Sequence, residues 1–315
     1  MKDVNEKGNN LHESDLSDFV AYTDASEVGF GGYVVPVNES LCAPVKDDIN
    51  SVETDCSLLA PRNSVNTLVG NWSETEQSLS STWRELEAAH KMIESSVHIL
   101  KNHTVTLKTD NKNVSSIVKN GSKKHNLQML ACDLYSLCTH NNIKLIPQWV
   151  PRENNKIADS LSRYVDCDDW GISDDVFQLL NCSWGRYTVD RFATDYNTKC
   201  SRFNSKYWCR GTEAIDAFTQ NWTRECNWVV PPPNLISRAI RKFCDDKAEG
   251  TLVVPLWTSA PYWVLLHKTD NNCMYFVKNK QILTHENLIV TGRGNNGAFA
   301  NTPLKFKMVA FRIRF

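Results

Sequence analysis

The sequence predicts an α/β protein: a mixed five-stranded sheet flanked by helices in residues 17–165, and a second, smaller α/β domain in residues 184–315. Three observations support this fold class. Extended runs come first and are followed by alternating helical and extended segments, the order of a layered mixed sheet. An acidic stretch containing Gly and Ser predicts a linker at 166–183. The length of 315 residues suits two domains, and 41% hydrophobic residues suffice for buried cores.

The elements of the first half follow from hydrophobic periodicity. Gly29, Gly31 and Gly32 predict a tight turn and a close backbone approach after the first strand. Residues 1–16 are polar and predict a tail, and residues 37–70 lack periodicity and predict an irregular insertion. We expect strands at 19–24, 33–35, 67–72, 104–109 and 143–150, and helices at 80–96, 111–119, 125–139 and 154–163.

Four carboxylates stand at the ends of these elements. Asp24 ends the first strand, Glu85 lies in the first turn of the first helix, Asp110 ends the fourth strand, and Asp159 lies in the last helix. Acids at strand ends and helix starts can converge on one edge of a sheet, where α/β proteins collect ligands. A single acid at such a place is more often a turn or cap residue, so the hypothesis depends on all four together.

A divalent cation would resolve the repulsion within such a cluster. Clustered carboxylates raise one another's pKa, and Mg²⁺ prefers oxygen ligands. Two ions about 3.5–4 Å apart can activate water and stabilise the leaving oxygen of a phosphodiester. The four acids are therefore candidate metal ligands and catalytic residues for Mg²⁺, as two ions, or for Mn²⁺.

The residues around the four acids resemble those of a known family. The runs are Tyr22–Ser26 (YTDAS), Trp83–Ala88 (WRELEA), Lys108–Asn111 (KTDN) and Trp149–Arg163 (WVPRENNKIADSLSR). They resemble the type 1 ribonuclease H domain of retrotransposon reverse transcriptases, over about residues 17–165. The resemblance implies a ribonuclease H-like fold and a metal-dependent endonuclease that cuts the RNA strand of an RNA–DNA hybrid. It also implies that the matching acids, Asp24, Glu85, Asp110 and Asp159, bind two Mg²⁺.

The chain departs from this family in two places. Many members carry a histidine just before the last helix that helps product leave, whereas Pro147–Val150 (PQWV) contains none. The insertion at 37–70 is also longer than the family leads us to expect. Slower turnover, or a different group in that role, would follow from the first departure.

The expected partner is an RNA–DNA hybrid, which needs phosphate contacts because the chain as a whole carries a net charge of only −1. The densest basic cluster consists of Lys119, Lys123, Lys124 and His125, although a solvated turn is an equally good interpretation. Lys112 lies near the expected metal edge. Contacts to 2′-hydroxyls and backbone are expected from Ser26, Asn111 and Arg152.

The second half resembles a different family. The quoted residues are Trp184–Gly185, Val189–Thr194, Asn197, Ile215–Phe218, Trp222 and Val230–Pro233. They are similar to the region that follows ribonuclease H in DIRS-like, tyrosine-recombinase retrotransposons, which is similar to phage-type DNA adenine N6-methyltransferases. Val230 and Pro233 stand where that chemistry needs a polar and an aromatic residue, and no glycine-rich loop for S-adenosylmethionine is visible. We therefore expect a degenerate, non-catalytic domain with no assigned cofactor-binding residues, and its binding of S-adenosylmethionine or nucleic acid stays open.

Composition also bears on the cellular location of the protein and on its possible partners. No apolar run approaches 18 residues, so no membrane partner is expected. The eleven cysteines form no CxxC pair and the start lacks a secretory signal, which predicts an intracellular protein of cytoplasm or nucleus. A reverse transcriptase part of the same element is a possible partner, and the oligomeric state stays open. The alternatives to a ribonuclease are an inactive nucleic-acid-binding module, a methyltransferase and a DDE-type integrase.

Overall fold

The structure is a computed structural model that describes residues 16–37, 60–166, 169–269, 272–285, 287–293, 299 and 304–315. Nearly all of the expected tail (1–16) and most of the expected insertion (37–70) lie outside the described residues. The chain divides into two compact units, Met1–Tyr164 and Val165–Phe315. No helix in the described ranges is long and apolar enough to cross a membrane.

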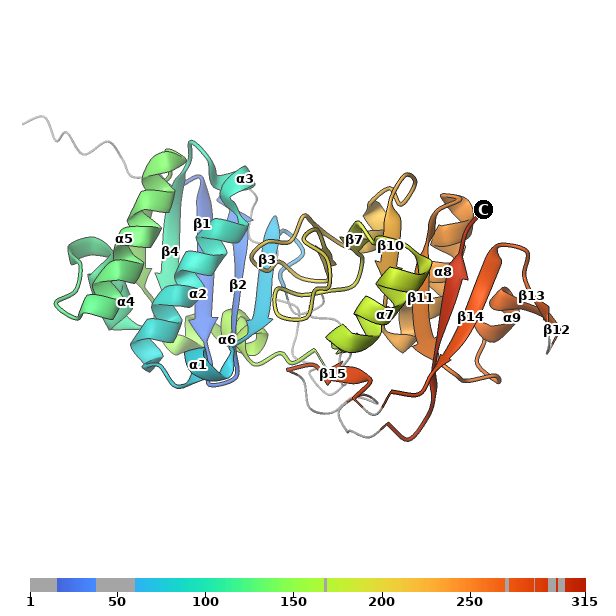
Figure 1. Ribbon diagram of the computed structural model, residues 1–315. Coiled ribbons are helices and arrows are strands. Elements are labelled where there is room, and N and C mark those ends of the chain that lie inside the picture. Colours follow the sequence, from blue (N-terminus) through green and yellow to red (C-terminus); the bar gives the residue numbers. More distant parts are fainter. Residues whose placement is uncertain are drawn as a thin grey trace, which may run out of the picture. The chain divides into compact units, whose positions relative to one another are not determined.

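The first unit is built on a mixed sheet with the strand order β3-β2-β1-β4-β5 (Figure 1). The pairs β1–β2 and β2–β3 are antiparallel, and β1–β4 and β4–β5 are parallel. The predicted mixed five-stranded sheet is therefore confirmed. Its strands are β1 (Phe19–Ala25), β2 (Gly29–Pro36), β3 (Asn66–Asn71), β4 (Thr104–Thr109) and β5 (Lys144–Trp149).

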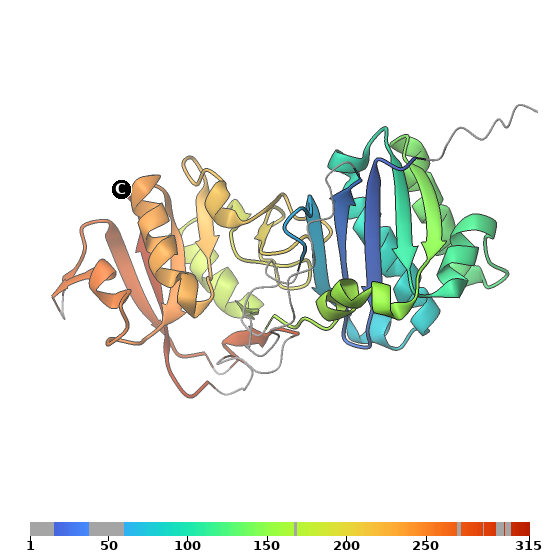
Figure 2. The ribbon, with the colours of Figure 1, turned by 180° about the vertical axis from the view of Figure 1, so that it is seen from behind.

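Helices cover both faces of this sheet. The long helix α2 packs on β1 and against α5, and α6 packs on β1 and β2 from the opposite face (Figure 2). Helix α2 begins after Ser80, whose hydroxyl accepts a hydrogen bond from the backbone of Trp83 and caps it. The helices are α1 (Glu74–Gln77), α2 (Ser81–Ser95), α3 (Val97–Leu100), α4 (Lys112–Asn120), α5 (His125–His140) and α6 (Lys156–Ser162), with a 3₁₀ turn at Arg152–Asn154.

The glycine-rich segment differs from the expectation in one respect. Gly29, Gly31 and Gly32 lie inside β2, and the turn is made by the residues between β1 and β2. The expected close approach is present, because a Cβ atom at Gly31 would lie 2.3 Å from the backbone nitrogen of Ser162. Glycine at this position therefore allows α6 to sit directly on β2.

The second unit holds a separate five-stranded sheet, in the order β14-β16-β11-β10-β7. The strands β7, β10 and β11 are parallel, while β16 and β14 are antiparallel to their neighbours. Helices α7 and α8 cover opposite faces, and each face has its own apolar core (Figures 1 and 2). The sheet strands and the two covering helices are β7 (Val189–Asp190), β10 (Cys226–Val229), β11 (Glu249–Pro255), β14 (Val277–Leu283), β16 (Met308–Ile313), α7 (Asp174–Trp184) and α8 (Ile236–Asp245).

Small elements complete the second unit. Three two-stranded sheets pair β15 with β6, β12 with β13 and β8 with β9. These elements are β6 (Trp170–Ile172), β8 (Asn204–Ser205), β9 (Ala214–Ile215), α9 (Trp263–Leu266), β12 (His267–Thr269), β13 (Asn272–Cys273) and β15 (Ile289–Thr291), with 3₁₀ turns at Ala217–Thr219 and Pro233–Leu235.

The segment expected to be a linker, 166–183, is instead largely folded. It contributes β6 and most of α7, and the side chains of Trp170, Val176 and Leu180 are buried in the core of the second unit. Asp174 and Asp175 stand in the first turn of α7, where negative charge favours the helix dipole. The acidic composition therefore marks the start of a helix.

Candidate functional site

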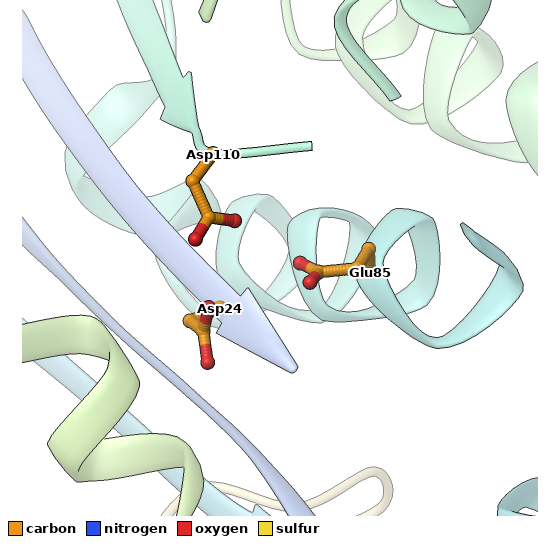
Figure 3. A group of neighbouring side chains, drawn as sticks. All are labelled: Asp24, Glu85 and Asp110. Carbon is orange, nitrogen blue, oxygen red and sulfur yellow. The ribbon is translucent and has the colours of Figure 1, made fainter. Parts of the chain in front are cut away.

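Two parallel strands bring the first pair of carboxylates together. Tyr22 of β1 is aligned with Lys108 of β4, so Asp24 and Asp110, each two residues further along, emerge side by side. Glu85 reaches the same place from the second turn of α2, one turn later than expected, and α2 packs on β1. Asp24, Glu85 and Asp110 each offer an oxygen, and these three oxygens lie within 4.8 Å of one another (Figure 3).

The environment of this cluster disfavours negative charge. Burial raises the pKa of Asp24 to about 6, against the lowering effect of a hydrogen bond from the Ser162 hydroxyl 2.6 Å from Oδ2. Burial, reinforced by the charges of Asp24 and Asp110, raises the pKa of Glu85 well above its usual range. Burial also raises the pKa of Asp110. Burial therefore outweighs the positive charge of Arg152, which acts on Asp24 and Asp110 in the opposite direction.

One oxygen in the cluster has no hydrogen-bond partner. Glu85 is 8% exposed, and its Oε2 is buried with no donor within reach in the described part of the chain. Buried polar atoms in folded proteins are nearly always satisfied, by protein, water or an ion. Three converging carboxylates with an unsatisfied buried oxygen fit a hard divalent cation such as Mg²⁺.

The fourth predicted acid, Asp159, is close but lies outside this group. Its carboxylate is held by two guanidinium groups, with Arg152 Nη2 at 2.6 Å and Arg163 Nη2 at 2.9 Å from Oδ1. Arg163 also donates from Nε to Oδ2 over 3.1 Å. These hydrogen bonds, with that of Arg163 the largest cause, lower the pKa of Asp159. The structure thus brings three of the four predicted ligands together and pairs the fourth with arginines.

Three of the residues predicted to contact nucleic acid also make hydrogen bonds within the chain. The Ser26 hydroxyl is buried and bonded within its own turn and to the carbonyl of Ser162, 2.6 Å away. Asn111 caps α4, because its Oδ1 accepts hydrogen bonds from the backbones of Asn113 and Val114. Arg152 is the partner of Asp159. The Asn111 cap is local, whereas the Ser26–Ser162 contact joins residues far apart in the sequence.

The predicted lysines are at the surface. Lys112 lies with its Nζ 4.6 Å from the ring centre of Trp149, whose indole nitrogen donates to the carbonyl of Asp110 over 2.8 Å. Lys123 and Lys124 are exposed in the loop between α4 and α5. The three lysines are therefore free to meet a polyanion.

Two residues that the sequence reasoning passed over support the cluster. Asn155 is 1% exposed, and its Nδ2 donates to the carbonyl of Thr23 over 2.9 Å, which fastens the start of α6 to β1. Ser162 does the same at the other end of α6, where its hydroxyl contacts Asp24. Asn155 and Ser162 both lie in Trp149–Arg163, one of the runs that resemble the ribonuclease H family. That resemblance was the signal in the sequence that could have identified them.

The second unit also buries charge near the ends of its parallel strands, but it satisfies that charge internally. Arg191 is 4% exposed and donates to Asn227 Oδ1 and Asn204 Oδ1, both at 2.8 Å, and to the carbonyl of Asn221 at 3.1 Å. Asp190 is also buried and accepts hydrogen bonds from the backbones of Phe192 and Lys199. These groups form a closed network.

Comparisons with known proteins agree with the division of the chain. Residues 67–165 match the family model "Reverse transcriptase-like". Residues 160–297 match the family model "DNA N-6-adenine-methyltransferase (Dam)". The predicted two-part resemblance, to a reverse transcriptase-associated domain followed by a methyltransferase-like region, is confirmed. No curated protein matches the chain.

Solved structures similar to the chain include ribonuclease H domains. The N-terminal RNase H domain of a Mycobacterium tuberculosis protein is 17% identical, with 45% of this chain and 94% of that chain covered and a TM-score of 0.34. RNase H1 from Halobacterium salinarum is 16% identical, with 45% and 92% covered and a TM-score of 0.32. The protease–reverse transcriptase of Prototype Foamy Virus is 14% identical, with 49% and 22% covered and a TM-score of 0.32.

Proposed function

We propose that the first unit is a metal-dependent endonuclease that hydrolyses the RNA strand of RNA–DNA hybrids, as part of a retrotransposon reverse transcriptase polyprotein. The observation that carries this proposal is the group Asp24, Glu85 and Asp110, with an unsatisfied buried oxygen on Glu85. The match of residues 67–165 to the reverse transcriptase-like family supports the same assignment.

In this proposal, each group of residues around the carboxylate cluster has a separate role. Asp24, Glu85 and Asp110 hold divalent cations, which supply Lewis acidity for phosphodiester hydrolysis when bound. Ser162 orients Asp24 by its hydrogen bond, and Trp149 fixes the backbone at Asp110. Lys112, Lys123 and Lys124 are exposed and provide phosphate contacts. Asp159 belongs to the site as the fourth carboxylate.

Cleavage of an end-labelled RNA–DNA hybrid tests this function. The full chain is expected to cut the RNA strand with Mg²⁺ or Mn²⁺ and to lose this activity with a chelator. Asp110→Asn is expected to fold and to be inactive, because it removes one charge and little volume. Metal-dependent cutting that survives in Asp110→Asn would contradict the site. Absence of cutting by the folded wild-type chain would favour an inactive binding module.

For the second unit we infer a non-catalytic role. Val230, which stands where methyl transfer to adenine needs a polar group, is 4% exposed and packs in the apolar core that also holds α7 residues. The nearby Arg191 network uses the amide oxygens of Asn204 and Asn227 within the fold. Incubation of the chain with radiolabelled S-adenosylmethionine and adenine-containing DNA is expected to leave the DNA unlabelled, and labelled DNA would contradict this inference.

A further inference from the structure

The side chain of Asp159 is turned toward cations of its own chain. Arg163, four residues further on, grips both carboxylate oxygens, and Arg152 adds a third contact to Oδ1. Such bidentate, charge-assisted hydrogen bonds are the strongest that arginine makes. An Asp159 carboxylate bound in this way has neither oxygen free of arginine contact for a divalent ion.

The backbone of Asp159 is nevertheless anchored beside the cluster. The Ser162 hydroxyl lies 2.6 Å from Asp24 Oδ2 and 2.9 Å from the backbone oxygen of Asp159. The positive charge of Arg152 also acts on Asp24 and Asp110. The negative charge of Asp159 raises the pKa of Asp24 and of Asp110, so its carboxylate already lies near the cluster while the arginines hold it.

Both arginines remain accessible to an incoming polyanion. The side chains of Arg152 and Arg163 are 63% and 55% exposed, whereas that of Asp159 is 22% exposed. Guanidinium groups bind phosphate with the same planar, two-pronged geometry that they use for carboxylates. A nucleic-acid phosphate at this edge can therefore replace Asp159 as the partner of the arginines.

We propose that Arg152 and Arg163 form a clamp that withholds Asp159, so that the chain alone binds one divalent ion at Asp24, Glu85 and Asp110. A nucleic-acid phosphate that takes over the clamp releases Asp159 to complete a second ion position. The arginines are positioning residues in this scheme, since they act through Asp159. The proposal rests on the proposed function, because it concerns the same carboxylates.

Counting bound Mn²⁺ tests the clamp without relying on activity. Free Mn²⁺ is measured by electron paramagnetic resonance during titration of the full-length chain, with and without a 2′-O-methyl RNA–DNA hybrid, and ions bound by the hybrid alone are subtracted. The wild-type chain is expected to bind one ion alone and two with the hybrid. The double variant Arg152→Ala/Arg163→Ala is expected to bind two ions without hybrid, the second about tenfold more tightly than in the wild type.

Two further variants separate the clamp from general electrostatics. Lys156→Ala removes an exposed positive charge from the same helix and is expected to behave as the wild type. Arg163→Lys keeps the charge but loses the two-pronged contact, so its second ion is expected to bind with intermediate affinity. This conservative variant also provides a result if the double variant fails to fold.

The outcomes distinguish this proposal from the proposed function. One ion for both the wild type and the double variant, two ions for the wild type without hybrid, or an equal gain in Lys156→Ala would each overturn the clamp while leaving the metal site in place. A wild-type chain that binds no Mn²⁺ would overturn the carboxylate site, and with it both proposals.

Discussion

Both units bury charged groups, but they differ in the neighbours that surround those groups. In the first unit, Asp24, Glu85 and Asp110 face one another, and burial raises the pKa of each. In the second unit, every hydrogen-bonding nitrogen of the buried Arg191 has an oxygen partner from the same unit. Asp190 likewise receives two backbone N–H groups.

This difference separates a site from a structural network. A closed network gains nothing from an added ligand, and loss of one member leaves the others unsatisfied. A cluster of like charges is strained until a counter-ion arrives, and loss of one member relieves it. Substitutions of these buried charged groups should therefore mainly affect activity in the first unit and stability in the second.

Glu85→Gln should cause the largest loss of activity and, at the same time, make the metal-free fold more stable. Removal of this charge is expected to reduce hybrid cleavage by at least about a hundredfold. It should also stabilise the metal-free fold by about 1 kcal/mol, because an amide is cheaper to bury than a carboxylate. Urea unfolding in chelator and cleavage rates measure both. The exposed Glu27→Gln is the control, and a less stable Glu85→Gln variant would contradict the assignment.

Arg191→Ala should lower the stability of the second unit and leave the cleavage activity unchanged. It leaves the oxygens of Asn204, Asn221 and Asn227 without their donor and is expected to destabilise the second unit by about 3 kcal/mol. Cleavage per folded molecule should be unchanged. Urea denaturation measures the loss, with the exposed Arg241→Ala on α8 as control. Equal stability of the two variants would show that the network is unimportant.

The contribution of Asp24, Asp169 and Asp190 to the stability of the metal-free chain should fall as pH rises from about 4 to about 7. Burial raises the pKa of Asp24 to about 6, and those of Asp169 and Asp190 to about 7, so the folded chain binds protons that the unfolded chain has released. This contribution is complete below about pH 4 and is lost as pH rises through the folded-state values. Mg²⁺ should recover only the part that belongs to the first unit, a shift of several degrees in Tm.

Thermal unfolding at several pH values, with and without Mg²⁺, measures this prediction. The Mg²⁺ effect should disappear in Asp24→Asn, which removes a member of the carboxylate cluster, and persist in Asp190→Asn, which lies in the other unit. A Mg²⁺ effect that is the same in both variants would mean that the ion acts elsewhere.

Substitution of Lys123 and Lys124, in the loop between α4 and α5, should have the smallest effect, and this effect should be on hybrid binding. Replacement of Lys123 and Lys124 by Ala is expected to weaken hybrid binding and to lower the slope of log K against log salt by about one for each lost phosphate contact. Fluorescence anisotropy across a salt series measures the slope. Lys305 and Lys307, exposed in the second unit, are the control pair. An unchanged slope would return the loop to the solvated-turn interpretation.

Local patterns predicted much of the first unit and less of the second. Helix α5 and strand β4 follow from periodic burial, and the motif around each carboxylate placed three of four acids at one edge. Helix α7 was missed because Asp174 and Asp175 look like linker composition. A helical signal was present, because Val176, Phe177 and Leu180 are spaced to bury one helix face directly after these two acids.

The contacts of the Asp159 side chain could not be predicted from its local sequence. Its motif identified it as a ligand, while the four-residue spacing to Arg163 also indicates an ion pair on one helix face. Both interpretations are local and conflict with each other. Only the fold, which also brings Arg152 from the preceding turn, shows which contact is made in the chain alone.

The contact between Gly31 and α6 has a consequence for how this chain tolerates mutation. A methyl group there would meet the backbone of Leu161 and Ser162 at 2.4 and 2.3 Å, so α6 would have to lift from the sheet. That shift would carry Ser162 away from Asp24 and Asp159 away from its neighbours. A variant of this chain with alanine at position 31 would keep every carboxylate and still lose the arrangement on which the proposed nuclease activity depends. A comparison of related sequences that scores only the acidic residues would therefore count such a variant as having an intact site.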